Sequence, residues 1–327
     1  MELFQHTIKK TIRIAGVGLH SGKPVRLTIK PAKANSGLRF VRADLARKTV
    51  IPAFMTRVID TRLATTIAED DISISTTEHL LAALTGMGID NAIIELDGAE
   101  VPIMDGSAGP FVHMLNKISR RQQKSARKMI KINREIVYQE GDRYIKVNPF
   151  DGFKITCCID FEHQTIKKQS YTFTYSPKRF ADEIASARTF GFAEDVDYLR
   201  GNGFALGGSL ENAVVIDRQG VINQEGLRFD DEFVRHKILD IMGDIALLGC
   251  PLLGHVTAYK SGHGQHLALL QKIAANPDCW DFVKFEKRGE RKMLEQIAST
   301  SRVAGNMILP FLLPHPTQLV AGDICPA

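Results

Sequence analysis

Cysteine is scarce in this sequence, and the few cysteines do not form the pattern of a disulfide scaffold or of a cysteine zinc site. The five cysteines include one adjacent pair, Cys157 and Cys158, and none of them forms a Cys-x-x-Cys motif. An odd number of irregularly spaced cysteines is typical of reduced thiols. We therefore expect a cytoplasmic protein in which cysteine holds no zinc.

Long apolar runs are absent as well. The first ten residues contain no apolar signal core, and the best apolar run, at residues 307–314, is interrupted by Pro310. Because a membrane-spanning helix needs about 20 predominantly apolar residues, the sequence predicts neither a secretion signal nor an integral membrane segment.

A strong excess of charge of either sign is also missing. The chain has 42 Lys and Arg against 37 Asp and Glu, a formal net charge of +5. This balance argues against a nucleic-acid-binding protein and is compatible with a small anionic substrate.

An alternation of strand and helix patterns predicts an α+β fold. The length of 327 residues exceeds a typical single core and predicts two domains. Residues 117–134 carry eight Lys or Arg and no acid, which is typical of a solvated linker or surface arm, so we place the domain boundary near residue 126. The predicted strands are at residues 11–14, 25–29, 91–96, 130–137, 144–147, 153–161, 213–217 and 255–260, and the predicted helices at 75–84, 110–118, 180–190, 233–244 and 265–275.

A glycine-rich segment, Gly-Val-Gly-Leu-His-Ser-Gly at residues 16–22, separates the first two predicted strands. Its third glycine falls one place too late for a dinucleotide fingerprint, and the flanking segments resemble hairpin strands. We therefore predict a turn and not a phosphate site. His20 in this turn could face a site across it, but we expect a surface histidine.

The predicted helix at residues 233–244 has two faces. His236, Asp240 and Asp244 follow one another at intervals of four residues, about 200° of helical rotation from an apolar stripe. A His and an Asp at positions i and i+4 can bind one metal ion, and a solvated polar face is the competing interpretation. The apolar stripe consists of Val234, Ile238, Ile241, Ile245 and Leu248.

Two more segments supply groups for metal binding or proton transfer. Glu78 and His79 stand at the start of a predicted helix, where Glu78 could equally be a capping carboxylate. His263 lies in a Ser-Gly-His-Gly turn. A catalytic zinc ion needs three protein ligands and one open position, and His79, His236 and Asp240 would supply two imidazoles and a carboxylate.

Seven ordered motifs give the chain its resemblance to a known family. They are Gly-Val-Gly-Leu-His at 16–20, Ser-Thr-Thr-Glu-His at 75–79, Pro-Ile-Met-Asp-Gly-Ser at 102–107, Ala-Arg-Thr-Phe-Gly-Phe at 187–192, Leu-Gly-Gly-Ser at 206–209, Asp-Glu-Phe-Val-Arg-His-Lys-Ile-Leu-Asp at 231–240 and Tyr-Lys-Ser-Gly-His at 259–263. Over about residues 5–286 the chain resembles the UDP-3-O-acyl-N-acetylglucosamine deacetylases, zinc amidases of bacterial lipid A synthesis. The resemblance implies hydrolysis of the acetamide of that UDP-sugar, which releases acetate and UDP-3-O-acyl-glucosamine.

The resemblance also implies roles for individual residues. One zinc ion per chain would be held by His79, His236 and Asp240. Glu78 corresponds to the general base and His263 to the general acid or electrostatic stabiliser. The remaining matches are Thr189 to an oxyanion-stabilising threonine, Asp244 to the carboxylate paired with the histidine, and Lys237 to a substrate-contacting lysine.

The implied fold consists of two α+β domains of similar topology, each a β-sheet layer packed on helices, at residues 1–126 and 127–327. The site would lie between them, and a small βαβ-type insert at about residues 190–216 would form a passage for the acyl chain. The expected substrate contacts in the insert, which plain core packing would also suit, are Phe190, Phe192, Val196, Ala205, Gly208, Ser209, Ala213 and Val215.

For the residues that would bind the UDP part of the substrate, the sequence offers only suitable residue types. The diphosphate requires Lys or Arg, for which Lys237, Lys260 and Arg143 are candidates, and uracil requires an aromatic face such as that of Phe161. These are also ordinary surface or core residues. The tail at about residues 289–327 departs from the family and contains a Pro-rich apolar part at residues 309–314.

Two other functions stay open at this stage. One is a zinc amidohydrolase acting on another acylated sugar, and the other is a non-catalytic protein that binds a nucleotide sugar or an acyl chain on the same scaffold. The presence of Glu78, His263 and Thr189 favours the enzyme. We expect a monomer whose partner is a UDP-sugar with a long acyl chain.

Overall fold

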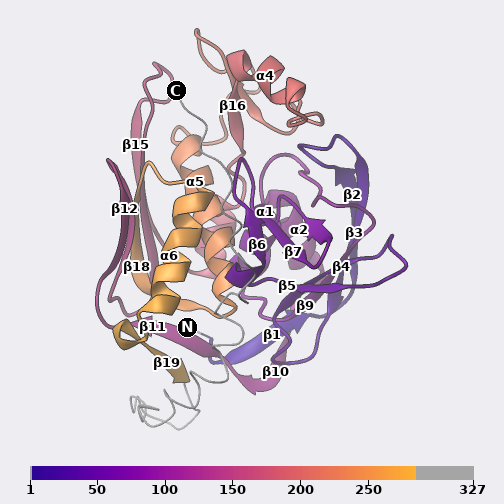
Figure 1. Cartoon of the computed structure of the whole chain (residues 1–327), viewed down its shortest axis with the longest axis vertical. Coiled ribbons are helices and arrows are strands. Elements are labelled where there is room, and N and C mark those ends of the chain that lie inside the picture. Colours follow the sequence, from indigo (N-terminus) through magenta and orange to yellow (C-terminus); the bar gives the residue numbers. More distant parts are fainter. Residues whose placement is uncertain (1, 285–327) are drawn as a thin grey trace, which may run out of the picture.

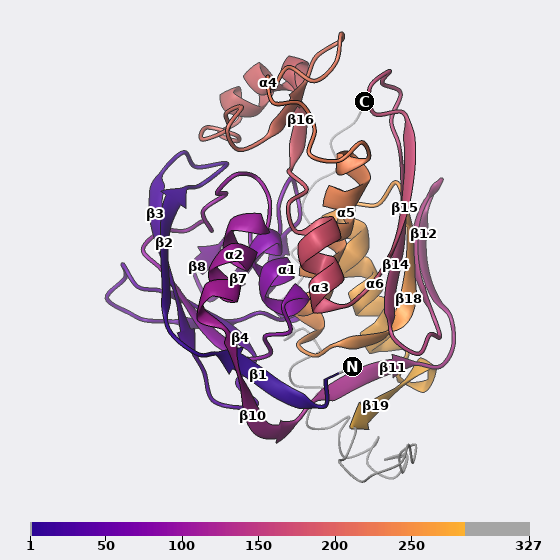
Figure 2. The same ribbon diagram turned by 180° about the vertical axis from the view of Figure 1, so that it is seen from behind.

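The computed structural model describes residues 2–284 and has a mixed α+β architecture. In Figure 1 and in the reverse view of Figure 2, helices lie between two β-sheet layers. The helices are α1 (Glu78–Gly86), α2 (Gly109–Ile118), α3 (Pro177–Arg179), α4 (Val196–Gly201), α5 (Glu232–Ile245) and α6 (His263–Ala275), with short helical turns η1 (Met55–Arg57), η2 (Phe180–Ile184), η3 (Ala193–Asp195), η4 (Ala246–Leu248) and η5 (Pro277–Cys279). The predicted α+β class is confirmed.

The first sheet layer has five strands in the order β2-β3-β9-β4-β5. Its strands are β2 (Ile12–Val17), β3 (Pro24–Pro31), β4 (Leu38–Arg42), β5 (Val50–Pro52) and β9 (Ala92–Leu96), and a smaller sheet of β6 (Val58–Asp60), β7 (Thr66–Glu69) and β8 (Ile72–Ile74) accompanies it. β2 and β3 pair antiparallel, so the glycine-rich segment at residues 16–22 supplies the end of β2 and then the predicted hairpin turn.

The second sheet layer has seven strands. Its path is β12-β13-β18-β11-β19, and β14 adds to β18 with β15 beyond it. The central strand β18 runs parallel to β11 and β14 and antiparallel to β13. The strands are β11 (Lys128–Ile132), β12 (Ile136–Glu140), β13 (Arg143–Asn148), β14 (Phe153–Asp160), β15 (Lys168–Thr174), β18 (Leu252–Tyr259) and β19 (Trp280–Lys284).

The basic stretch at residues 117–134 is not a linker, so this prediction is wrong. It forms β10 (Arg120–Ala126), which pairs antiparallel with β1 (Phe4–Ile8), and then β11. The side chains of Arg121 and Lys124 are exposed, although the backbone of this strand pairs with β1. Charge predicted the solvation of these side chains correctly but carries no information about backbone pairing.

The predicted helix at residues 180–190 is shorter than expected. Helical structure ends with η2, and the chain becomes extended again at β16 (Phe190–Phe192). β16 pairs in parallel with β17 (Val214–Ile216), with α4 between them in the chain. This βαβ unit extends from one end of the molecule, at the top of Figure 1.

Helix α5 joins the two layers and contacts α1 at very short range. Its apolar stripe, which includes Val234, Ile238 and Ile241, is fully buried. At Gly243 a Cβ atom would lie 2.1 Å from the backbone oxygen of Glu78, so only glycine allows this approach of the two helices. The contact brings the start of α1 beside the polar side of α5.

No helix within residues 2–284 is long and apolar enough to span a membrane. Cys157, Cys158, Cys250 and Cys279 are free thiols, in agreement with the prediction. The tail at about residues 289–327 lies outside the described residues.

Candidate active site

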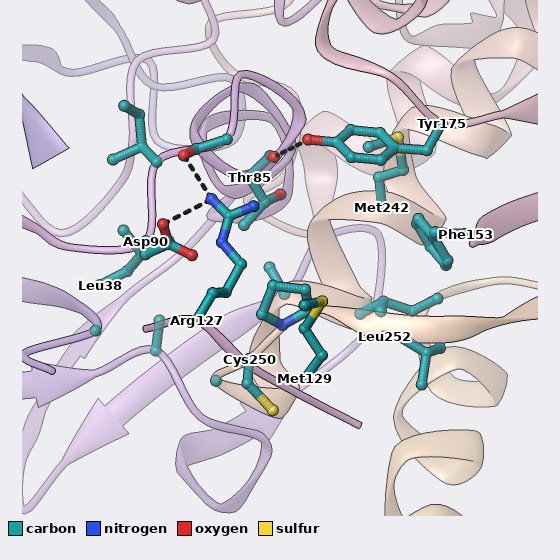
Figure 3. A pocket seen from close by; sticks show the side chains of 18 of the residues that line it. Leu38, Thr85, Asp90, Arg127, Met129, Phe153, Tyr175, Met242, Cys250 and Leu252 are labelled. Atoms are coloured by element: carbon teal, nitrogen blue, oxygen red, sulfur yellow. Dashed lines mark hydrogen bonds and ion pairs between the residues drawn. The ribbon is translucent and has the colours of Figure 1, made fainter. Parts of the chain in front are cut away.

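A hollow of about 120 Å³ lies beside the C-terminal end of α5, and none of the predicted metal ligands lines it. Its lining is mainly apolar and includes Met242. The close-up in Figure 3 shows that its polar groups bond one another: Arg127 donates to Asp90 at 2.7 Å, and the Tyr175 hydroxyl donates to the backbone oxygen of Thr85 at 3.1 Å. None of the predicted catalytic groups lines this hollow, so it is not the site of the predicted chemistry.

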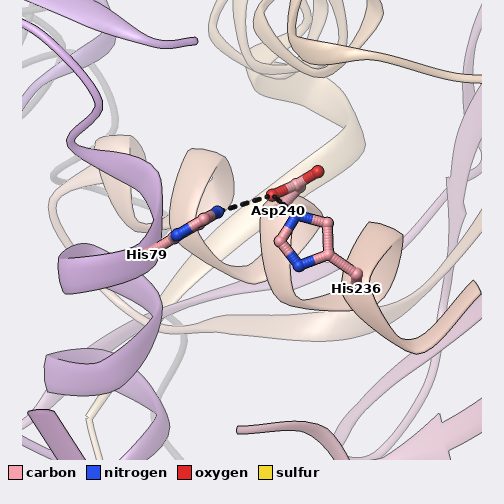
Figure 4. A group of neighbouring side chains, drawn as sticks. All are labelled: His79, His236 and Asp240. Atoms are coloured by element: carbon pink, nitrogen blue, oxygen red, sulfur yellow. Dashed lines mark ion pairs between the residues drawn. The ribbon is translucent and has the colours of Figure 1, made fainter. Parts of the chain in front are cut away.

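The predicted metal ligands meet in space. His79 at the start of α1 and His236 and Asp240 on α5 offer ligand atoms that lie within 4.8 Å of one another (Figure 4). Asp240 Oδ1 is 3.6 Å from Nε2 of His79 and 3.4 Å from Nε2 of His236. All three residues are buried, so the solvated-face interpretation of this helix is wrong.

The state of these three side chains fits a metal ion. Asp240 Oδ1 is buried without a hydrogen-bond partner, although it lies between the two imidazoles. A buried carboxylate oxygen without a partner is rare and indicates a missing ligand. The backbone oxygen of Ala187 lies 3.1 Å from Nδ1 of His236, which fixes the ring and leaves Nε2 for the metal.

Electrostatics keeps the ligands in the form that binds a metal. Burial lowers the pKa of His236 to about 3, so its imidazole is neutral. Burial opposes ionisation of Asp240, but the polar imidazoles of His236 and His79 and the charge of Lys237 together outweigh this effect and hold its pKa well below the usual range. Lys237 Nζ contacts Asp240 Oδ2 at 2.9 Å and leaves Oδ1 free.

The carboxylate of Glu78 does not cap α1. Thr77 precedes α1 without a side-chain capping bond, and the carboxylate of Glu78 accepts a hydrogen bond from the backbone N–H of Thr65 at 3.0 Å. The capping interpretation is therefore wrong. Burial raises the pKa of Glu78, although the neighbouring His263 and His79 counteract it. A carboxylate of raised pKa is a stronger proton acceptor.

His263 and Asp244 form the predicted pair. Nδ1 of His263, the first residue of α6, lies 2.7 Å from Asp244 Oδ2 on α5. Burial disfavours the charged imidazole, but the charge and hydrogen bond of Asp244 outweigh it and raise the pKa of His263 to about 9. Burial likewise opposes ionisation of Asp244, and His263 outweighs it, so the pKa of Asp244 falls to about 2. At neutral pH His263 can donate a proton.

Known proteins resemble this chain over most of its length. The family model described as UDP-3-O-acyl N-acetylglycosamine deacetylase (LpxC) matches residues 5–275. The chain belongs to the LpxC family. It is 48% identical over 284 residues to UDP-3-O-acyl-N-acetylglucosamine deacetylase of Myxococcus xanthus, with 87% of this chain and 90% of the relative covered. Proteins of the same name from Pseudomonas entomophila and Methylococcus capsulatus are both 49% identical, over 284 and 287 residues, with 86% and 87% of this chain and 94% of each relative covered.

Thr189, which the resemblance matches to an oxyanion-stabilising threonine, stands two residues after Ala187, whose backbone oxygen lies 3.1 Å from Nδ1 of His236. Its backbone N–H donates to Gly106 at 2.8 Å and its backbone oxygen accepts from Val214 at 2.8 Å, so the segment is held from both sides. The preceding Arg188 is fully buried and bonds to Glu232 of α5 at 2.9 Å. These contacts fix the backbone that carries the Thr189 hydroxyl.

An aromatic cluster borders the triad of this LpxC-family chain. Phe190 lies edge-on to Phe161 and Phe233, with ring centroids 5.8 and 4.9 Å away, and its centroid is 6.4 Å from that of His236. Phe161 also contacts Phe192 at 6.0 Å. The predicted uracil-binding residue Phe161 therefore shares one apolar wall with two residues predicted to line the acyl passage.

The insert residues are not ordinary core. None of Phe190, Phe192, Val196, Ala205, Gly208, Ser209, Ala213 and Val215 is buried. The backbone N–H of Leu206 donates to the oxygen of His20, which ties the insert to the glycine-rich turn. His20 itself packs on Phe204 at 5.5 Å, so the expectation of a surface histidine is wrong.

The two other candidate cations are neighbours at one end of the second sheet. Arg143 and Lys260 are adjacent in the chain to the paired residues Tyr144 and Tyr259. Arg143 is exposed. Lys260, which stands three residues before His263 in the chain, donates to Asp142 at 3.0 Å. Their contact with a diphosphate stays a prediction.

Sequence reasoning missed two residues of the site. Thr65 donates from its hydroxyl to Asp244 at 2.6 Å, and His266 bonds to the same carboxylate at 2.6 Å. The spacing of three residues between His263 and His266 on one helix was a usable signal for the second histidine. Thr65 had no such signal, because only the tertiary fold brings it to Asp244.

Proposed function

We propose that this chain hydrolyses the acetamide of UDP-3-O-acyl-N-acetylglucosamine with one zinc ion, an early step of lipid A biosynthesis. The observation that carries the proposal is the buried triad of His79, His236 and Asp240, with Glu78 and His263 close enough to interact with it electrostatically. The substrate follows from the printed names of the relatives, which match over most of the chain. The products are acetate and UDP-3-O-acyl-glucosamine.

Both ends of the acetamide need assistance, since it is a poor electrophile and its amine a poor leaving group. A bound zinc ion supplies Lewis acidity that activates water and polarises a carbonyl group. Glu78 accepts a proton from the attacking water as the bond from oxygen to the carbonyl carbon forms. The Thr189 hydroxyl donates to the developing oxyanion, and His263 gives its proton to the nitrogen as the C–N bond breaks.

The surroundings of the triad support the rest of the substrate assignment. Lys237 Nζ lies 5.5 Å from the centre of the Phe190 ring, so a cation stands between the metal site and the aromatic wall. We assign the acyl chain to this wall and the insert, and the diphosphate to Lys237, Lys260 and Arg143. We assign uracil to Phe161, because its ring belongs to the same aromatic cluster.

The proposal also includes the finer organisation of the chain. We propose two domains of similar topology with a boundary near residue 126, a monomeric state and a cytoplasmic location. The end of β10 at Ala126 supports the boundary, because β10 pairs with β1 of the first part while β11 pairs with β18 and β19 of the second. Light scattering on the purified chain tests the monomer.

Removal of the metal tests the proposed function directly. Protein purified under native conditions is expected to contain about one zinc ion per chain and to release acetate from the UDP-sugar. Treatment with a chelator should abolish acetate release, and stoichiometric zinc should restore it, because water and carbonyl both depend on the ion. A zinc-free protein with full activity would contradict the proposal, and turnover of other acylated amides alone would favour a different amidohydrolase.

The pH dependence of kcat/KM is expected to be bell-shaped. Burial raises the pKa of Glu78, and the unprotonated base is required, so the rate should rise with pH through a range above that of an ordinary glutamate. His263 must be protonated and its pKa is about 9, so the rate should fall above about that pH. The His263→Gln variant should lose the alkaline limb, and a wild-type profile with one limb would refute the acid–base assignment.

A further inference from the structure

The carboxylate of Asp244 accepts more hydrogen bonds than its pairing with His263 requires. Its Oδ2 is 2.7 Å from Nδ1 of His263 and 2.6 Å from Nδ1 of His266, and its Oδ1 is 2.6 Å from the Thr65 hydroxyl. Asp244, His266 and Thr65 are all buried. Three donors thus converge on one buried carboxylate.

The chemistry of these groups fixes the positions of the protons. An ionised carboxylate only accepts hydrogen bonds, so both imidazoles must carry a proton on Nδ1. Nε2 of His263 is then the ring atom left for the leaving amine. Nε2 of His266 lies 3.1 Å from the hydroxyl of Ser261, which gives the second histidine its own partner.

Thr65 connects this carboxylate to the base on the other side of the site. Its hydroxyl bonds to Asp244, while its backbone N–H bonds to Glu78 Oε2 at 3.0 Å. The position of Thr65 is fixed in turn, because its backbone oxygen accepts from the backbone N–H and the hydroxyl of Thr77 at 3.2 and 3.0 Å. One residue therefore spans the groups on both sides of the reacting bond.

We propose that Thr65 and His266 are positioning residues that hold the Asp244 carboxylate in one orientation and thereby aim His263 at the leaving nitrogen. A carboxylate with a single donor can rotate about its last side-chain bond. The Thr65 hydroxyl on Oδ1 opposes this rotation, and the second imidazole on Oδ2 restricts the movement of the oxygen that His263 contacts. The inference rests on the proposed function, since it assigns the two residues to the acid of that reaction. Neither residue needs to contact substrate or metal.

Paired variants of His266 test the proposal in zinc-loaded enzyme. His266→Leu removes the donor to Asp244 and is expected to lower kcat about 10-fold, with KM and zinc content unchanged. His266→Asn can place an amide N–H where Nδ1 lies and is expected to recover most of kcat. Equal loss in both variants, or loss of zinc in either, would overturn the proposal.

Paired variants of Thr65 provide a second test if the His266 variants fold poorly. Thr65→Val keeps the shape and the backbone bond to Glu78 but loses the hydroxyl, and kcat should again fall about 10-fold at constant KM. Thr65→Ser keeps the hydroxyl and should retain the activity of the wild type. A Thr65→Val enzyme with unchanged kcat would refute the part of the proposal that concerns this residue.

Nuclear magnetic resonance separates failure of this inference from failure of the proposed function. In zinc-loaded protein labelled with ¹⁵N-histidine, two downfield N–H signals, from Nδ1 of His263 and Nδ1 of His266, are expected. His266→Leu should remove one signal and shift the other, whatever amide the enzyme hydrolyses. A His263 signal that is unchanged in both His266→Leu and Thr65→Val would show that neither residue positions the pair.

Discussion

Glu78→Gln is expected to lower kcat by about three orders of magnitude while the protein keeps its zinc. The amide has the size of the carboxylate and can still accept the hydrogen bond from the Thr65 backbone, so the fold around it should be unchanged. It cannot accept the proton of the attacking water, and general base catalysis contributes about 10²- to 10⁴-fold. Acetate release under saturating substrate and metal analysis of the same sample measure both quantities.

A control variant distinguishes the loss of the proposed base from the loss of a negative charge elsewhere in the protein. Glu183 bonds to Tyr171 and Arg179 in a region that contains none of the proposed catalytic groups, so Glu183→Gln should keep kcat within about twofold. If Glu78→Gln instead loses zinc together with activity, Glu78 is a ligand or a structural support and not the base.

The helix that carries the site could be predicted almost entirely from its own residues. A helix at residues 233–244 was expected, and α5 runs from Glu232 to Ile245 with the predicted apolar stripe buried. Its periodicity also placed His236 and Asp240 on one face. Whether that face met solvent or a metal was not a local property, because burial of the face depends on α1.

The packing of α1 against α5 could not be predicted from local sequence patterns. His79 and His236 are 157 residues apart, and the close approach of their helices at Gly243 depends on the packing of a glycine against the backbone of Glu78. From sequence alone, a glycine inside a predicted helix indicates only low helix propensity, and not a close contact with a second helix. Ligand chemistry therefore suggested the three residues, and the resemblance assigned them to one zinc ion, but only the fold brings them together.

The errors outside the site have the same origin. Residues 120–126 were expected to be solvated, and their side chains largely are, yet their backbone pairs with β1 from the other end of the first part of the chain. Residues 185–190 were expected to be helical, but Thr189 and Phe190 bond to Gly106 and the β17 segment instead. In both segments long-range backbone bonds override the local preference.

Asp240→Ala is expected to abolish zinc binding and, with it, detectable acetate release. The variant removes the only carboxylate of the triad and leaves the Lys237 ammonium without its partner at 2.9 Å. Loss of one partner of a buried pair costs about 3 kcal/mol, so the midpoint of thermal unfolding should also fall. Metal analysis, acetate release and calorimetry on one preparation measure the three effects.

The matched control for this variant is Asp244→Asn, one helical turn further along α5. It should keep zinc, because Asp244 faces His263 and His266 and not the triad, but its activity should fall by up to about 10⁴-fold since the imidazole loses its charged partner. Zinc loss in Asp240→Ala with zinc retention in Asp244→Asn would separate the two carboxylates of one helix face into a metal ligand and an orienting group. A zinc content near one per chain in Asp240→Ala would instead exclude Asp240 as a ligand and leave only two imidazoles, too few for a catalytic zinc site.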